Sequence, residues 1–295
     1  MHALFHYHLT ATIIHTLSFT LLFQLQADGE ELYQISIPYV KHSGSDGIST
    51  TFLHEKVFGE FTLIALLLVN EAVTAVSHLA GVIGFGFYRR QMVEDDRHAE
   101  VIRRYVEYAI TAGLLEASLY VLIGGRDANL LLAIVITNAI IQLLGYMLER
   151  TANVQRQIYL NVAGFILLVV PIVALVSSAV LTEDFVSISV YYTVLYALFG
   201  VHSLLHILSK AWRDFIDKDA GYIVLGVAAK ECLTWMAVAV QAKRYEDYGT
   251  KVKSVADYVD VEFFMMWFPI AVMGFILWAV FVSSRVTVND SYDKI

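Results

Sequence analysis

A lysine within a long apolar segment is the first chemically unusual feature of this sequence. Lys230 lies about ten residues from either end of the segment 220–241, so a helix would carry its amine about 15 Å from each membrane surface. A charge at that depth costs roughly 2.5 to 3.5 kcal/mol even on insertion scales. Lys230 therefore needs an acidic partner or a chemical modification. A structural ion pair and a coupling-ion site in a transporter both remain open on this observation.

Glu107, in the stretch IRRYVEYAITA, is the best candidate partner for this lysine. A cation on Lys230 would favour the ionised form of the Glu107 carboxyl by direct attraction. Thr111 follows four residues later and therefore lies on the same face of a helix. The alternative is that Glu107 pairs with Arg103 or Arg104 at the end of the helix.

Two histidines are expected at a comparable depth. His15 lies a few residues into the first apolar segment, and His78 lies about two turns before the end of the second, with Thr74 one turn away. A neutral imidazole accepts or relays a proton near physiological pH. Each histidine alone is typical of a protein interior. Together with Glu107 and Lys230 they predict a polar cavity that accepts protons.

The elements that position these side chains are predicted to be membrane-spanning helices. The chain of 295 residues is 58% hydrophobic with a mean hydropathy of +0.62, which is typical of a protein in lipid. Its apolar segments reach the roughly 20 residues needed to cross a bilayer. We expect an all-α polytopic membrane protein, a seven-helix bundle plus one additional C-terminal helix. The predicted spans are 8–26, 57–87, 101–123, 128–148, 157–180, 186–208, 220–241 and 261–283.

Three units are expected along the chain. Residues 1–241 form the bundle, 242–260 an outer linker, and 261–295 the eighth helix with a tail. Between the first two spans, the loop 27–56 contains the β-prone stretch YQISIPYV followed by SGSDG, which predicts a hairpin on the outer membrane surface.

Charge and motifs limit the function. The net charge of −8 argues against nucleic acid as a partner, and a single cysteine excludes a disulfide framework and a multi-cysteine metal site. No hydrolase or metalloprotease motif supports an enzyme, and no metal site is expected. The first apolar segment lacks the features of a cleaved signal peptide. With the N-terminus inside, 12 basic residues face the cytoplasm and 7 face outward, so both termini are predicted to be cytoplasmic.

Two stretches of this sequence resemble the heliorhodopsin family. They are WRDFIDKDAGYIVLGVAAKECLTW, from Trp212 to Trp235, and RYVEY, from Arg104 to Tyr108. His15 and His78 occupy positions of cavity histidines in that family, and the orientation with the N-terminus inside agrees. The resemblance covers the first seven predicted helices.

The resemblance implies a light receptor with all-trans retinal bound as a Schiff base on Lys230 and with Glu107 as its counterion. Thr74 and Thr111 would replace serines near the counterion, and Arg104 would join that network. A homodimer is also implied. The implied retinal pocket consists of Tyr108, Asn138, Tyr196, Phe199, His202 and Trp235, although ordinary helix packing explains Tyr196 and Phe199 equally well.

The sequence departs from the family at several positions. Gly226 stands one turn before the lysine where a serine is usual, and Glu231 replaces a small polar residue. Glu116 lies nine residues beyond Glu107, roughly 14 Å further along the helix. The eighth predicted helix is a further difference.

These acids permit a second activity, passive proton conduction triggered by light, with Glu116 on a discontinuous path that includes Glu107 and the two histidines. The simpler interpretation of Glu116 is a protonated acid bonded to a neighbouring helix. A different class of function is a secondary transporter without chromophore that uses Lys230 and Glu107 as a coupling pair. No internal repeat of the kind common in transporters is visible in the sequence.

Overall fold

The computed structural model describes residues 3–26, 32–45, 48–87, 95–180 and 186–247. Within these ranges the chain forms seven long helices, one short helix and a two-stranded hairpin. The helices are α1 (Ala3–Gln26), α2 (Leu63–Phe87), α3 (Asp95–Leu122), α4 (Ala128–Arg150), α5 (Val154–Val180), α6 (Val186–Leu208), α7 (Lys210–Phe215) and α8 (Lys218–Asp247).

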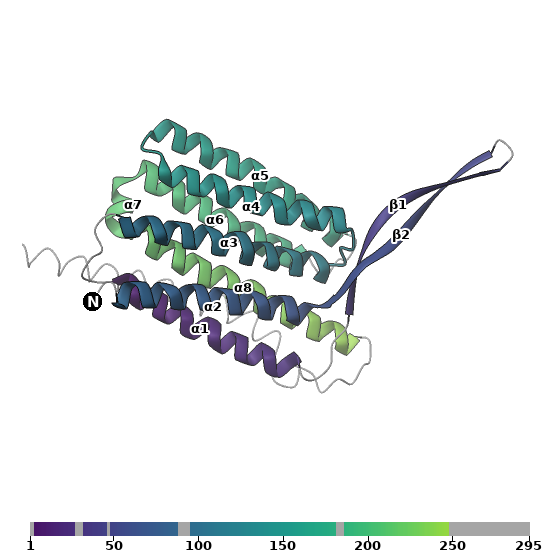
Figure 1. Cartoon of the computed structure of the whole chain (residues 1–295), viewed down its shortest axis with the longest axis horizontal. Coiled ribbons are helices and arrows are strands. Elements are labelled where there is room, and N and C mark those ends of the chain that lie inside the picture. Colours follow the sequence, from purple (N-terminus) through teal and green to yellow (C-terminus); the bar gives the residue numbers. More distant parts are fainter. Residues whose placement is uncertain (1–2, 27–31, 46–47, 88–94, 181–185, 248–295) are drawn as a thin grey trace, which may run out of the picture.

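The long helices run antiparallel to their chain neighbours in one bundle, which Figure 1 shows from the side. The helices α1 and α2 form one side of the bundle and α4 and α5 the other, with α3, α6 and α8 between them. Six of the long helices are long and apolar enough to cross a membrane. The exception, α3, has a lower hydropathy because it carries many charged residues, yet it packs against α2, α4 and α8.

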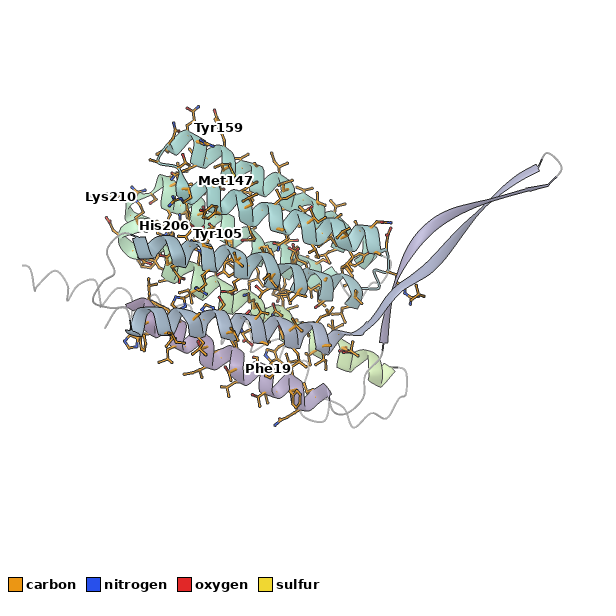
Figure 2. All side chains as sticks on the ribbon, in the orientation of Figure 1. Phe19, Tyr105, Met147, Tyr159, His206 and Lys210 are labelled. Atoms are coloured by element: carbon orange, nitrogen blue, oxygen red, sulfur yellow. The ribbon has the colours of Figure 1, made fainter. Side chains whose placement is uncertain are left out.

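The two faces of the helices have different surroundings. Large apolar side chains such as Ile136 and Val169 are exposed on the outside of the bundle, as expected where lipid replaces water. Tyr159 also points away from the bundle (Figure 2). In contrast, α8 is 83% buried over its apolar window, compared with 11% for α4. The helix that carries Lys230 is therefore the central element of the fold.

The hairpin consists of β1 (Leu32–Ser45) and β2 (Ile48–Thr62), paired antiparallel from Leu32 with Thr62 to Ser45 with Ile48. It projects well beyond the bundle (Figure 1), and we call the end of the bundle that it leaves the hairpin end. The second span was predicted to begin at residue 57, which is wrong. Residues 57–62 belong to β2, and α2 begins at Leu63, where the Thr62 hydroxyl accepts a hydrogen bond of 3.2 Å from Ala65 N.

Buried leucines fill the bundle toward its hairpin end. They come from the last turns of α1, the first turns of α2, the second half of α3 and the second half of α8. We call Leu22, Leu63, Leu67, Leu119 and Leu233, each 0% exposed, the leucine layer.

The seventh predicted span corresponds to α8, which continues to Asp247, six residues beyond the predicted end. The eighth predicted span, 261–283, and most of the preceding linker lie outside the described residues.

Candidate functional site

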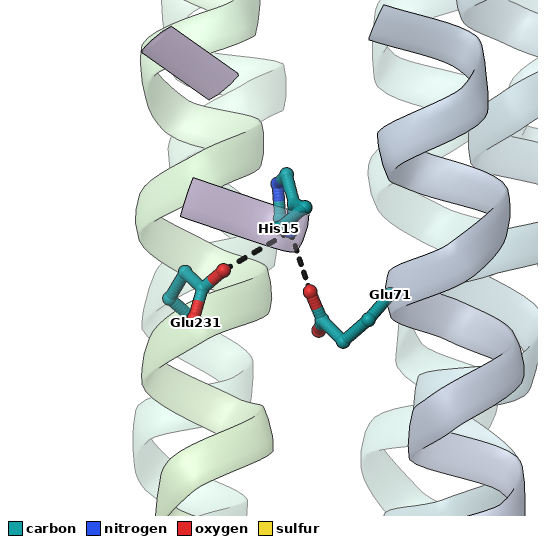
Figure 3. Close-up of side chains that lie close together, drawn as sticks. All are labelled: His15, Glu71 and Glu231. Atoms are coloured by element: carbon teal, nitrogen blue, oxygen red, sulfur yellow. Dashed lines mark hydrogen bonds and ion pairs between the residues drawn. The ribbon is translucent and has the colours of Figure 1, made fainter. Parts of the chain in front are cut away.

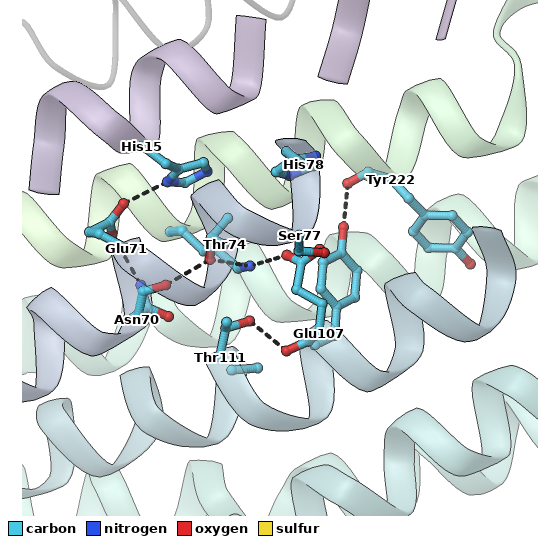
Figure 4. A network of polar contacts seen from close by, with 12 residues as sticks. His15, Asn70, Glu71, Thr74, Ser77, His78, Glu107, Thr111 and Tyr222 are labelled. Carbon is cyan, nitrogen blue, oxygen red and sulfur yellow. Dashed lines mark hydrogen bonds and ion pairs between the residues drawn. The ribbon is translucent and has the colours of Figure 1, made fainter. Parts of the chain in front are cut away.

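Lys230 and Glu107 meet in the interior of the bundle. The Lys230 Nζ donates to Glu107 Oε1 at 2.5 Å and to the Thr74 hydroxyl at 2.9 Å, and Lys230 and Glu107 are 5% and 3% exposed. Figure 4 shows Glu107 close to Thr74 and Ser77 of α2. Burial of two charges is tolerable only when they pair and are hydrogen-bonded, and both conditions hold here.

The second carboxylate oxygen of Glu107 has different partners. Its Oε2 accepts from the Ser77 hydroxyl at 2.7 Å and from Arg103 Nη1 at 3.0 Å. The Thr111 hydroxyl lies on the same turn but donates to the Glu107 backbone oxygen. Lysine and arginine therefore both neutralise this carboxylate, so the two interpretations of Glu107 considered above hold together.

Arg104 does not belong to this network, contrary to the expectation. Its side chain contacts Asp219 on α8, and its Nη2 lies 2.5 Å from Glu149 Oε1 on α4. Lys218 Nζ lies 3.3 Å from the same Glu149 oxygen. Consecutive residues on a helix point about 100° apart, so Arg103 faces α2 while Arg104 faces α4 and α8.

A cavity of about 130 Å³ adjoins Lys230 and extends between α3, α4, α5 and α6. Most of its lining is apolar or aromatic, which suits a long apolar ligand whose polar end lies at the lysine. Four predicted pocket residues line it, namely Tyr108, Asn138, Tyr196 and Phe199. Phe165 and Tyr222 also line it and were not predicted.

The other two predicted pocket residues, His202 and Trp235, are not among the lining residues. His202 Nε2 lies 3.1 Å from the backbone oxygen of Lys218, and its ring packs against Trp212. Trp235 Nε1 donates to Ser18 and to Glu231 on the α1 side of α8. Trp235 lies five residues after Lys230, which turns it by about 140° away from the lysine.

Gly226 accommodates a tyrosine. A Cβ at this position would lie 2.7 Å from the Tyr108 hydroxyl oxygen. That hydroxyl donates to the backbone oxygen of Tyr222 at 2.8 Å, and Lys230 Nζ lies 5.1 Å from the centre of the Tyr108 ring. The tyrosine thus occupies the space that a serine side chain would need.

A second buried polar cluster lies beside the lysine on the α1 side. His15 Nδ1 lies 2.6 Å from Glu71 Oε2 and 3.0 Å from Glu231 Oε1 (Figure 3). His15 and Glu71 are 0% exposed and Glu231 is 5% exposed. One histidine nitrogen and one oxygen from each of the two carboxylates lie within 4.8 Å of one another. Glu71 was not singled out in the sequence, although an acid in the apolar stretch LLLVNEAV was a visible signal.

His78 connects this cluster to a third histidine. Its ring stacks on His15 at 5.9 Å between centroids, and its Nδ1 lies 2.9 Å from His8 Nδ1. His8 Nε2 lies 3.4 Å from Glu100 Oε1, near the end of the bundle opposite the hairpin. His8 and Glu100 could not be recognised from sequence because both lie near predicted helix ends, where polar residues are common.

Glu116 lies apart from both clusters. Its Oε1 accepts from the Tyr192 hydroxyl at 2.6 Å, and its Oε2 is buried with no hydrogen bond partner among the described residues. The described contacts do not connect Glu116 to Glu107 or to the histidines.

A family model described as Heliorhodopsin matches residues 4–241. Among solved structures, a light-driven proton pump from Leptosphaeria maculans matches with 12% identity and a TM-score of 0.47, covering 84% of this chain and 96% of that one. No match was found among curated proteins.

Proposed function

The chain belongs to the heliorhodopsin family, and we propose on this basis that it is a light-absorbing membrane receptor with all-trans retinal bound as a Schiff base on Lys230. Its family and its membrane-spanning helices make it an integral multi-pass membrane protein with a retinal chromophore. The attachment site, the isomer and the roles below are parts of the proposal.

One observation supports the attachment site above all others. The Lys230 amine lies where the aromatic cavity meets the polar network, so one side of the lysine faces apolar residues and the other faces a carboxylate. Retinal bound there supplies absorption of visible light and a change of shape on isomerisation. The cavity residues Tyr108, Tyr196 and Phe199 would orient it and exclude water.

The protein's own residues would hold the charge at the lysine nitrogen. Glu107 acts as counterion, and Thr74 accepts a hydrogen bond from the same nitrogen. Ser77 and Arg103 hold the other Glu107 oxygen, so the carboxylate keeps its position when the lysine nitrogen moves. A change of charge or position at the lysine nitrogen would therefore alter hydrogen bonds on α2 and α3, and these helices would respond structurally.

The test is purification with all-trans retinal followed by an absorption spectrum and borohydride reduction. We expect a visible band and a label on Lys230. A colourless protein, or a label on another side chain, would refute the proposal. A colourless protein would instead favour the transporter with a Lys230 and Glu107 coupling pair.

Light-activated proton transport is a second candidate activity. The buried Glu116, with an oxygen that lacks a described hydrogen bond partner, favours it. In voltage-clamped cells, Glu116→Gln should abolish a photocurrent, and an unchanged current would remove Glu116 from the path.

The cytoplasmic location of both termini and the homodimer also remain proposals. Protease accessibility of the termini in sealed vesicles would test the first, and light scattering of the purified protein the second.

A further inference from the structure

Beyond the counterion pair, we infer that His15, Glu71 and Glu231 form a proton-storing cluster that exchanges protons only with the end of the bundle opposite the hairpin. This cluster adds a proton acceptor to the proposed photoreceptor, and its response to light rests on the proposed function. The protons held in the dark do not depend on retinal.

In this cluster two carboxylates face the same ring nitrogen. Two carboxylate oxygens, from Glu71 and Glu231, lie 2.6 and 3.0 Å from the same His15 Nδ1. One ring nitrogen carries at most one proton and cannot fully satisfy two carboxylates. A protonated His15 neutralises one of the two acids, and the other can bind a proton of its own.

A charge balance leads to the same conclusion. An unbalanced charge in the membrane interior is costly, so the buried groups from Lys230 to the His15 cluster and on to Glu100 should together be close to neutral. These groups include four carboxylates and two permanent cations among the described residues, so two more protons are required. His15 and His8 are placed to hold them, because each lies beside a carboxylate. The carboxylates are Glu71, Glu100, Glu107 and Glu231, and the cations are Lys230 and Arg103.

The neighbouring ion cluster does not change this balance. Two cations, Arg104 and Lys218, face two acids, Glu149 and Asp219.

Glu231 is the acid of the cluster that can gain a proton. The Glu71 oxygens are contacted by three groups, His15 Nδ1, Asn70 Nδ2 and the Thr234 hydroxyl, which stabilise the ionised form. The Glu231 Oε2 accepts from Ser18 and Trp235, whereas its Oε1 has only the longer contact with His15.

The proposed transfer conserves charge. When the Lys230 nitrogen releases its proton, that nitrogen loses one positive charge. Binding of a proton at Glu231 Oε1 converts the carboxylate to a carboxylic acid and removes one negative charge. The net charge of the region is unchanged, and the return of the proton to Lys230 restores the first state.

The surroundings of the cluster determine where protons can leave. Toward the opposite end, His78 stacks on His15, His8 contacts His78, and Glu100 lies beside His8. Glu100 is bonded to Arg103, whose side chain is 17% exposed, so this series reaches the surface. Toward the hairpin end, Ser18 and Thr234 donate to the acids of the cluster, and beyond them the side chains of the leucine layer carry no group that can transfer a proton.

Infrared difference spectroscopy of the pigment tests the acceptor. Illumination should produce a protonated-carboxyl band that Glu231→Gln abolishes while the visible band persists, and that Glu231→Asp retains at a shifted frequency. Asp127→Asn is the matched control, since Asn still caps α4 and lies outside the network. A light-induced band that survives in Glu231→Gln, or that disappears in Glu116→Gln instead, overturns the inference.

The exit route is tested with the rate at which the same band shifts in frequency after the illuminated pigment is transferred to deuterated water, because that shift requires exchange with the medium. His8→Asn should slow proton exchange with the medium roughly a hundredfold, the lower end of what a positioned proton-transfer group contributes. His6→Asn is the control, because His6 lies on the same helix with an exposed side chain. Equal rates in the two variants would contradict the route.

A measurement in the dark separates this inference from the proposed function. Nitrogen-15 NMR of the histidine rings, with His15 assigned through His15→Asn, should show both His15 ring nitrogens protonated at neutral pH with or without retinal. A neutral His15 ring overturns the storage cluster even if the pigment forms. Failure of pigment formation refutes the proposed function and leaves the NMR result to decide on the cluster.

Discussion

The two sides of the bundle differ sharply around the same lysine. On the side of α1 and α2, Lys230 contacts a carboxylate and a hydroxyl. The His15 and Glu71 pair lies near these groups (Figure 4). On the side of α4, α5 and α6, Lys230 borders a cavity lined by aromatic and aliphatic residues. We call these the polar side and the apolar side. Different helices thus hold the charged groups and line the cavity, and among the described helices only α3 and α8 contribute to both.

The largest effect should come from the residue at the boundary. Lys230→Ala removes the proposed attachment point, so the visible absorption band should vanish completely after incubation with retinal. Lys210→Ala, at an exposed position outside both sides, should keep the band. Full absorbance in Lys230→Ala would show that the boundary lysine is not the attachment site.

On the polar side, Glu107→Gln should shift the absorption maximum to longer wavelength, because the positive charge at the lysine nitrogen loses its nearest anion. Loss of one partner of a buried ion pair also destabilises a protein by about 3 to 5 kcal/mol. Glu149→Gln, in the separate cluster around Arg104, should destabilise the protein without a comparable spectral shift. Spectra and thermal bleaching curves of both variants distinguish the two cases.

Where the two sides meet, Gly226→Ser should displace Tyr108. Overpacking of a core lowers the free energy of unfolding by about 1 to 3 kcal/mol. The hydrogen bond from the Tyr108 hydroxyl to the backbone oxygen of Tyr222 should also break. Gly84→Ser is the control, because a Cβ there meets nothing within 4 Å and Gly84 does not line the cavity. Equal thermal stability of the two variants would show that Tyr108 does not need the space at Gly226.

The smallest effect is expected on the apolar side. Asn138 Nδ2 makes long contacts of 3.3 Å with the backbone oxygens of both Tyr108 and Ala109, so Asn138→Leu should cost only about 0.5 to 1.5 kcal/mol in total. Asn129→Leu, at an exposed position, should lower the free energy of unfolding by less than Asn138→Leu does. A larger loss in Asn138→Leu than in Glu107→Gln would reverse the ranking of the two sides.

The sequence contained enough to predict much of this site. Apolar segment length indicates which residues are in the membrane, and position within a segment gives depth, so Lys230 and Glu107 could be paired before the fold was seen. The same rule applied to Glu71 would have found the second cluster. Helix α2 was placed too early because Val57 was counted with the apolar stretch that follows, whereas residues 57–62 belong to β2, which pairs with β1.

What the sequence by itself determined is therefore the all-helical membrane fold and the approximate position of each ionisable group along its helix. Only the tertiary structure decided which groups touch. Arg103 rather than Arg104 reaches Glu107, and Trp235 faces α1 rather than the cavity. The physical reason is that hydropathy reports position along a helix axis, whereas contacts depend on rotation about that axis and on the helix packed opposite, both of which arise only when the bundle assembles.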